Sequence, residues 1–168
     1  MIDLILRYTL PAAYALLPPA MASREASALL LAIGLQESGF LTRRQRLGGP
    51  ARGFWQFERG GGVHGVLTHP AVAFHIEAAC SALVYRTPSG IREHELHAAI
   101  EHNDVLACVF ARLLLWTLPD PLPGRDASGL GWAMYLSAWR PGRPHSDTWP
   151  AHYAEAWARV DEFEEAGS

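Results

Sequence analysis

The sequence contains 168 residues, of which 49% are hydrophobic and 18% charged, and its formal net charge is −3. A chain of this length buries enough apolar surface to fold as one domain. The balanced charge argues against a general nucleic-acid binder, and the absence of a long apolar stretch argues against membrane insertion. All 14 basic residues are arginines, which excludes chemistry that depends on lysine, such as Schiff bases and P-loop phosphate binding.

Residues 1–22 have an apolar centre and end in small residues, as a signal peptide does. However, Asp3 stands where such peptides carry positive charge, Arg7 interrupts the apolar stretch, and prolines divide it into short pieces. We therefore expect a lead-in helix followed by a turn, and a chain without a signal peptide of its own.

The first long helix is predicted from Ser23 to Ser38. Ser23 is a favourable N-cap residue, and apolar residues follow it at helical spacing. Gly39 provides a stop signal, so Glu37 is expected at the C-terminal end of this helix. The following segment, 40–65, is rich in glycine and contains an aromatic group at 54–57, which predicts an irregular loop or short hairpin.

Helical patterning returns in the second half of the chain. The apolar run 105–118 places its large side chains on one stripe, which predicts the central buried helix. Cys80 and Cys108 lie within apolar runs, and we expect both to be reduced core thiols. Other helices are predicted after Thr68 with Pro70 in the first turn, after Ser89, over 131–139, and from Asp147 or Thr148. The sequence thus predicts a single, mainly α-helical domain over 1–168 with a small irregular or β-hairpin lobe.

Glu37 is the strongest candidate for a catalytic group. The C-terminal end of a helix carries partial negative charge, and apolar neighbours remove water from the side chain. Both effects disfavour the ionised carboxylate and raise its pKa, which a general acid requires. The glycine-rich loop that follows places this acid on the wall of a cleft, whereas a frayed helix end would leave it on the surface.

Three segments carry a resemblance to a known family. Residues 36–40 read Gln-Glu-Ser-Gly-Phe, residues 49–56 read Gly-Pro-Ala-Arg-Gly-Phe-Trp-Gln, and residues 138–142 read Ala-Trp-Arg-Pro-Gly. They resemble the glutamate-serine, glycine-leucine-methionine-glutamine and alanine-tyrosine-asparagine-x-glycine motifs of soluble lytic transglycosylases. Those enzymes are lysozyme-like and cleave peptidoglycan. The resemblance therefore implies a lysozyme-like fold, of the kind found in goose-type lysozyme, and activity on peptidoglycan. The wider pattern is also similar to small phage-encoded wall-lysing proteins, and it includes Arg-Arg-Gln at 43–45, Gly-Gly-Gly-Val at 60–63 and Trp-Arg-Pro-Gly at 139–142.

By this resemblance, Glu37 is the general acid and base that cleaves the β-1,4 bond between N-acetylmuramic acid and N-acetylglucosamine, leaving a 1,6-anhydro end. The 2-acetamido group of the sugar replaces a protein nucleophile, so one glutamate suffices. The partners implied are peptidoglycan glycan strands and phage virion or lysis proteins, with no nucleic acid, cofactor or metal. Action is expected in a phage virion or in the host periplasm and cell wall. The implied substrate-binding residues are Gln56, Gly53, Trp55, Tyr135, Trp139 and Arg140.

Individual roles follow from the same motifs. Gln56 is expected to hydrogen-bond the saccharide, and Gly53 to let its loop approach Glu37 closely. The side chain of Trp55 is expected to face the groove, where it or Tyr135 stacks on a sugar ring.

The third motif departs from the family pattern, because Trp139 and Arg140 replace its tyrosine and asparagine. The missing phenol has two candidate substitutes. Tyr135 lies four residues earlier on the same helical face and offers a hydroxyl to the carboxylate of Glu37. Alternatively, Arg140 approaches that carboxylate and lowers its pKa.

Two further functions stay open at this point. Glu58 lies two residues after Gln56 and either faces Glu37, which would permit hydrolysis by a muramidase, or points into solvent and pairs with Arg59 or Arg52. The departure at Trp139 and Arg140 also permits a non-catalytic structural or wall-binding module with the same fold.

Overall fold

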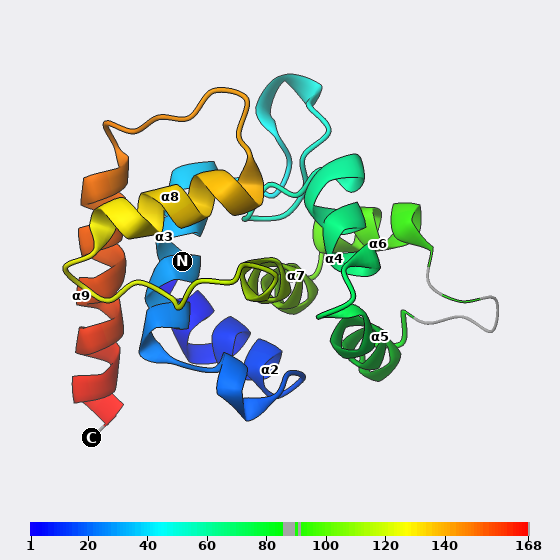
Figure 1. Ribbon diagram of the computed structural model, residues 1–168, viewed down its shortest axis with the longest axis horizontal. Helices are drawn as coiled ribbons and strands as arrows, with labels where there is room; N and C mark the ends of the chain where they lie inside the picture. Colours follow the sequence, from blue (N-terminus) through cyan, green and yellow to red (C-terminus); the bar gives the residue numbers. More distant parts are fainter. Residues whose placement is uncertain (86–89, 91, 168) are drawn as a thin grey trace.

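Helices account for most of the computed structural model, which describes residues 1–85, 90 and 92–167. The predicted mainly α class is confirmed (Figure 1). The α-helices in the described residues are α1 (Ile2–Leu4), α2 (Leu10–Tyr14), α3 (Arg24–Ser38), α4 (His64–Thr68), α5 (Ala73–Ala82), α6 (Glu93–Ile100), α7 (Asp104–Trp116), α8 (Ser128–Trp139) and α9 (Trp149–Gly167). Shorter π or 3-10 turns span Ile5–Thr9, Pro19–Met21, Arg46–Gly48 and Arg59–Val63.

Helix α7 is the central element, as predicted. Asn103 caps it by accepting a hydrogen bond from the backbone N–H of Leu106 at 3.0 Å. Every side chain from 106 to 115 is buried, so α7 is enclosed on all sides. Viewed end-on in Figure 1, α7 lies between α3, α8 and α9 on one side and α4, α5 and α6 on the other.

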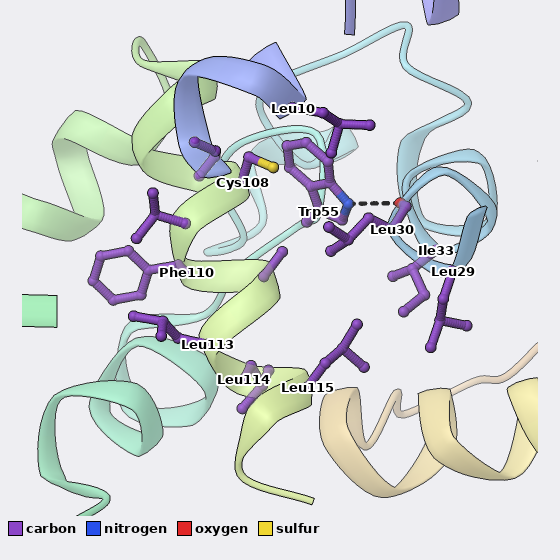
Figure 2. Packing of buried hydrophobic residues seen from close by; sticks show 14 of the residues in the cluster. Leu10, Leu29, Leu30, Ile33, Trp55, Cys108, Phe110, Leu113, Leu114 and Leu115 are labelled. Carbon is purple, nitrogen blue, oxygen red and sulfur yellow. Dashed lines mark hydrogen bonds between the residues drawn. The ribbon is translucent and has the colours of Figure 1, made fainter. Parts of the chain in front are cut away.

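The segment 1–22 forms the predicted lead-in helix and turn, and it packs against α7. Ile5 and Leu10 belong to the same hydrophobic cluster as α3 and α7. The guanidinium Nε of the buried Arg112 donates to the backbone oxygen of Met21 at 2.7 Å. The lead-in segment is therefore part of the core that surrounds α7, and Figure 2 shows Leu10 within it.

Both ends of α3 follow the sequence prediction. The Ser23 hydroxyl accepts a hydrogen bond from the backbone N–H of Ala26 at 3.1 Å. Gly39 ends the helix in the left-handed conformation, with φ 60°, and its N–H donates to the Leu35 oxygen. Helix α9 packs alongside α3 (Figure 1), so the C-terminal part of the chain supports the element that carries Glu37.

The glycine-rich lobe is irregular. In the described residues it contains isolated antiparallel bridges, which pair Arg52 with Arg44 and with Phe57, and no longer strand. The chain reverses tightly at its start, where the ring of Phe40 folds back against Gly34 of α3. A Cβ atom at Gly34 would lie 2.1 Å from that ring, so this helical glycine makes room for the lobe.

Two predicted boundaries in the next segment were wrong. The loop prediction extended to Gly65, but helical structure already begins at Arg59 because Val63 and Val66 turn inward and become buried. Pro70 lies in the turn before α5 and not in its first turn, since α5 begins at Ala73. The predicted start after Ser89 lies outside the described residues.

The remaining predictions for this half of the chain are confirmed. Helix α8 contains the predicted span 131–139, and α9 begins at Trp149, next to the predicted Asp147 or Thr148 start. Cys80 and Cys108 are buried free thiols, and burial raises the pKa of Cys80 to about 11. None of the helices in the described part of the chain is both long and apolar enough to cross a membrane.

Candidate active site

Glu37 lies in the last turn of α3, as predicted, with its side chain half-buried. Burial raises the pKa of this carboxyl from 4.5 to about 7, the hydrogen bond from Tyr135 lowers it, and the charge of Glu58 raises it further. Desolvation is the largest cause because it removes the water that would stabilise the anion. A carboxyl group that retains its proton near neutral pH has the property of a general acid.

Tyr135 is the phenol donor to this carboxyl group. Its hydroxyl donates to Oε1 of Glu37 at 2.7 Å, and its ring stacks on Trp149 with 5.4 Å between ring centroids and an angle of 12°. The ring stack restricts the phenol and therefore fixes the direction of the hydrogen bond. Of the two substitutes considered above, the structure selects Tyr135. Arg140 is exposed, and its Nε donates to the backbone oxygen of Ser137 at 3.3 Å.

The second motif is held between α3 and α8. The Ser38 hydroxyl donates to the backbone oxygen of Phe54 at 2.7 Å, and the Trp139 indole donates to the backbone oxygen of Trp55 at 2.8 Å. Ser38 belongs to the first motif segment and Trp139 to the third. The three motif segments are therefore joined by hydrogen bonds to the backbone of 54–55, which places Gln56 beside Glu37 on the same cleft.

The prediction that the Trp55 side chain faces the groove was wrong. Its indole is 0% exposed, and Nε1 donates to the backbone oxygen of Leu30 at 2.8 Å, as Figure 2 shows. The ring also packs edge-on against Phe40, with 5.8 Å between centroids. The lobe crosses α3 and α7 at this position, and a large aromatic residue fills the space there. Trp139 supplies the half-buried aromatic surface on the cleft instead.

Gly53 makes a close approach, but not to Glu37. A Cβ atom at this position would lie 2.8 Å from a side-chain carbon of Ile100 and 3.0 Å from its backbone oxygen. The residue also has φ 72°, in the left-handed region that favours glycine. The expectation that Gly53 lets its loop approach Glu37 was therefore wrong. The absence of a side chain at Gly53 instead lets the lobe pack on the end of α6.

Gln56 lines the cleft with its side chain half-buried. Its amide Nε2 donates to the backbone oxygen of Gly53 at 2.8 Å, and its backbone has φ 49°. The intraloop hydrogen bond leaves the amide oxygen as the acceptor available to a ligand.

One large cleft contains most of the predicted site. Its volume is about 1260 Å³, which exceeds the range of about 300–1,000 Å³ typical of small-ligand pockets and suits an extended ligand. Trp55 and Gly53 do not line it, whereas the other predicted side chains do. The sequence-predicted residues on its wall are Glu37, Gln56, Glu58, Tyr135, Trp139 and Arg140.

Sequence reasoning missed a second group of residues on the same wall. Arg143 and His145 follow α8 and line the cleft, as does Gln36, the neighbour of the candidate acid. Trp149 was also missed as the residue that supports Tyr135. The sequence signal for the loop residues was only their position directly after the third motif. No sequence signal within the loop itself indicates that it turns back toward α3.

Glu58 is exposed and lines the cleft. The expected ion pair with Arg59 or Arg52 was wrong, because Arg59 lies 3.9 Å from Glu93 and Arg52 lies 3.0 Å from Glu101. Glu58 instead acts on Glu37 through its charge. No group of three or more histidine, cysteine or acidic side chains in the described residues is arranged to hold a metal ion.

No protein-family model, curated protein or solved structure matches this chain.

Two substitutions next to Glu37 are expected to shift its pKa in opposite directions. Tyr135→Phe removes a hydrogen bond to the carboxylate and raises the pKa, whereas Glu58→Gln removes a negative charge and lowers it. The aromatic ring that packs on Trp149 is retained in Tyr135→Phe. Titration of the Glu37 carboxyl carbon by NMR measures both shifts directly. Shifts of the same sign in the two variants would contradict this account of the electrostatics.

Proposed function

We propose that this protein is a peptidoglycan lytic transglycosylase with a lysozyme-like fold and that Glu37 is its general acid and base. The observation that carries the proposal is the half-buried carboxyl group of Glu37. Its pKa is raised to about 7, and it lies on the wall of a cleft large enough for a glycan strand. The motif resemblance names the substrate, and the carboxyl supplies the chemistry.

The hydrogen bond from Tyr135 assigns different tasks to the two carboxyl oxygens. Oε1 accepts the phenol hydrogen, whereas Oε2 has no hydrogen-bond partner among the described residues. Oε2 is therefore the atom that carries the proton to the glycosidic oxygen. After transfer, the phenol stabilises the carboxylate, which then removes the proton from the muramyl 6-hydroxyl. During the first proton transfer the 2-acetamido oxygen attacks C1 and the bond from C1 to the glycosidic oxygen breaks. The deprotonated 6-oxygen then attacks C1, displaces the acetamido oxygen and closes the 1,6-anhydro ring.

The other residues of the cleft would bind the strand. The Gln56 amide oxygen accepts a hydrogen bond from the saccharide, and the half-buried Trp139 ring provides an apolar surface for a sugar face. A protein of this kind would degrade the wall from a phage virion or within a phage lysis system.

Hydrolysis by a muramidase is the second candidate, and Glu58 favours it. This carboxylate lines the same cleft and its charge acts on Glu37, so it is placed to orient a water molecule as a general base. Mass spectrometry of digested glycan separates the two reactions, since the anhydro product is lighter than the hydrolysis product by one water.

Zymography on purified peptidoglycan tests the proposal. The parent protein is expected to clear the gel and Glu37→Gln is not, with circular dichroism confirming that both are folded. Equal clearing by the two proteins would remove Glu37 from the chemistry. No clearing by either folded protein would favour a non-catalytic wall-binding module.

A further inference from the structure

The loop between α8 and α9 brings two unpaired arginines to the cleft. Arg140 and Arg143 both line it and both are exposed. Neither lies within 4.0 Å of a carboxylate in the described part of the chain, whereas eight other arginines there make such ion pairs: Arg24, Arg43, Arg44, Arg52, Arg59, Arg92, Arg125 and Arg159. The arginines on this wall are thus free to bind an external anion.

Gln36 fixes the position of this loop. Its amide nitrogen donates to the backbone oxygen of His145 at 2.9 Å, and its oxygen accepts hydrogen bonds from Thr148 at 3.1 Å and His152 at 2.9 Å. At the other end of the loop, Arg140 ends α8 in the left-handed conformation and its N–H donates to the Leu136 oxygen. The loop is therefore held at both ends against the helices that carry Glu37 and Tyr135.

The charges on the cleft are segregated. Glu58 is carried by the glycine-rich lobe, whereas Arg140 and Arg143 are carried by the loop after α8. In Figure 1 this loop (orange) and the lobe (cyan) approach each other at the top of the molecule. A ligand in the cleft therefore meets guanidinium groups from the loop after α8 and a carboxylate from the lobe, which favours an acidic ligand bound in one orientation.

We propose that Arg140 and Arg143 form a carboxylate-binding wall that recognises the acidic substituents of the glycan strand, with Gln36 as a positioning residue. This proposal rests on the proposed function and makes it more specific: the preferred substrate is a glycan that carries carboxylates, not a neutral amino-sugar polymer. Guanidinium groups bind carboxylates through paired N–H donors, and a neutral strand of the same sugars offers them no such partner.

Binding to three glycans tests the proposal in the Glu37→Gln background, where turnover does not interfere. The probes are soluble peptidoglycan strands whose peptide stems carry carboxylates, the same strands after amidase treatment, which removes the stems and frees the lactyl carboxylates, and neutral chitohexaose. The double variant Arg140→Gln/Arg143→Gln is expected to bind at least one acidic strand about 5- to 30-fold more weakly and chitohexaose unchanged. Gln36→Ala is expected to show the same selectivity with a smaller loss.

Arg7→Gln is the matched control, because Arg7 is exposed and does not line the cleft. A loss confined to intact strands would identify the stem carboxylates as the ligand, and a loss confined to amidase-treated strands would identify the lactyl carboxylate. A loss on both acidic strands would show that the arginines bind either carboxylate. Equal losses on all three probes, no loss on any, or no binding of any probe by the Glu37→Gln parent would overturn the proposal. The proposed reaction fails by a different result. In that case the wild-type protein does not clear the peptidoglycan gel, although the selective binding of acidic strands persists.

Discussion

Glu37→Gln is expected to be less active and, at neutral pH, more stable than the parent protein. Loss of a general acid lowers turnover on soluble peptidoglycan strands by about 10²–10⁴-fold. The gain in stability arises because the parent buries a carboxyl group whose pKa is raised from 4.5 to about 7. The amide of the variant carries no charge at any pH and still accepts the hydrogen bond from Tyr135.

The sign of the pH dependence follows from proton linkage. Below pH 4.5, Glu37 is protonated in both the folded and the unfolded state and contributes nothing. Between 4.5 and about 7 the unfolded state releases its proton first, so the free energy of unfolding falls as the pH rises. Above this window the loss is complete and amounts to roughly 3 kcal/mol relative to Glu37→Gln.

Urea denaturation of both proteins at pH 4, 6 and 8 measures this difference. The free energies of unfolding of the parent and Glu37→Gln should be most similar at pH 4 and should differ more as the pH rises. Glu155→Gln is a suitable control, because this exposed glutamate lies on α9 away from the cleft, and its removal should change stability by less than about 0.5 kcal/mol. A constant difference across the pH range would indicate that Glu37 is not a buried carboxyl with a raised pKa.

Gly53→Ala is expected to be the most damaging single-methyl change in the lobe, with a loss of about 2–5 kcal/mol in the free energy of unfolding. A left-handed conformation costs a non-glycine residue about 1–2 kcal/mol, and overpacking adds about 1–3 kcal/mol. Overpacking applies here because the new methyl group would lie 2.8 Å from a side-chain carbon of Ile100 and 3.0 Å from its backbone oxygen. The backbone oxygen cannot move aside as a flexible side chain can.

Gly48→Ala separates the two contributions. Gly48 also has a positive φ, 77°, but nothing lies within 4 Å of the added methyl group, so only the conformational cost of about 1–2 kcal/mol is expected. Chemical denaturation of both variants gives the comparison. Gly53→Ala should also reduce activity, since the Gly53 oxygen accepts hydrogen bonds from both the backbone and the side chain of Gln56. Equal losses of stability in the two variants would show that contact with Ile100 is unimportant.

Local sequence signals predicted the elements and the position of the acid. The N-cap at Ser23, the stop at Gly39 and the apolar spacing between them are properties of consecutive residues, and they placed Glu37 in the last turn of α3. The four-residue spacing between Tyr135 and Trp139 likewise predicted that both would face one way, and both line the cleft. Helical periodicity identified α7 because most of its large side chains are apolar.

The sequence by itself therefore determined most of the helical segments, both ends of α3, and that a carboxyl group lies in the last turn of α3. Only the tertiary structure decided that Trp55 fills the core, that Gly53 meets Ile100, and that the loop after α8 returns to Gln36. Caps and periodicity act between residues a few positions apart, whereas these contacts join residues separated by 25 to 109 positions. Several partners of equal chemistry are available at such separations, and packing of the whole chain selects among them.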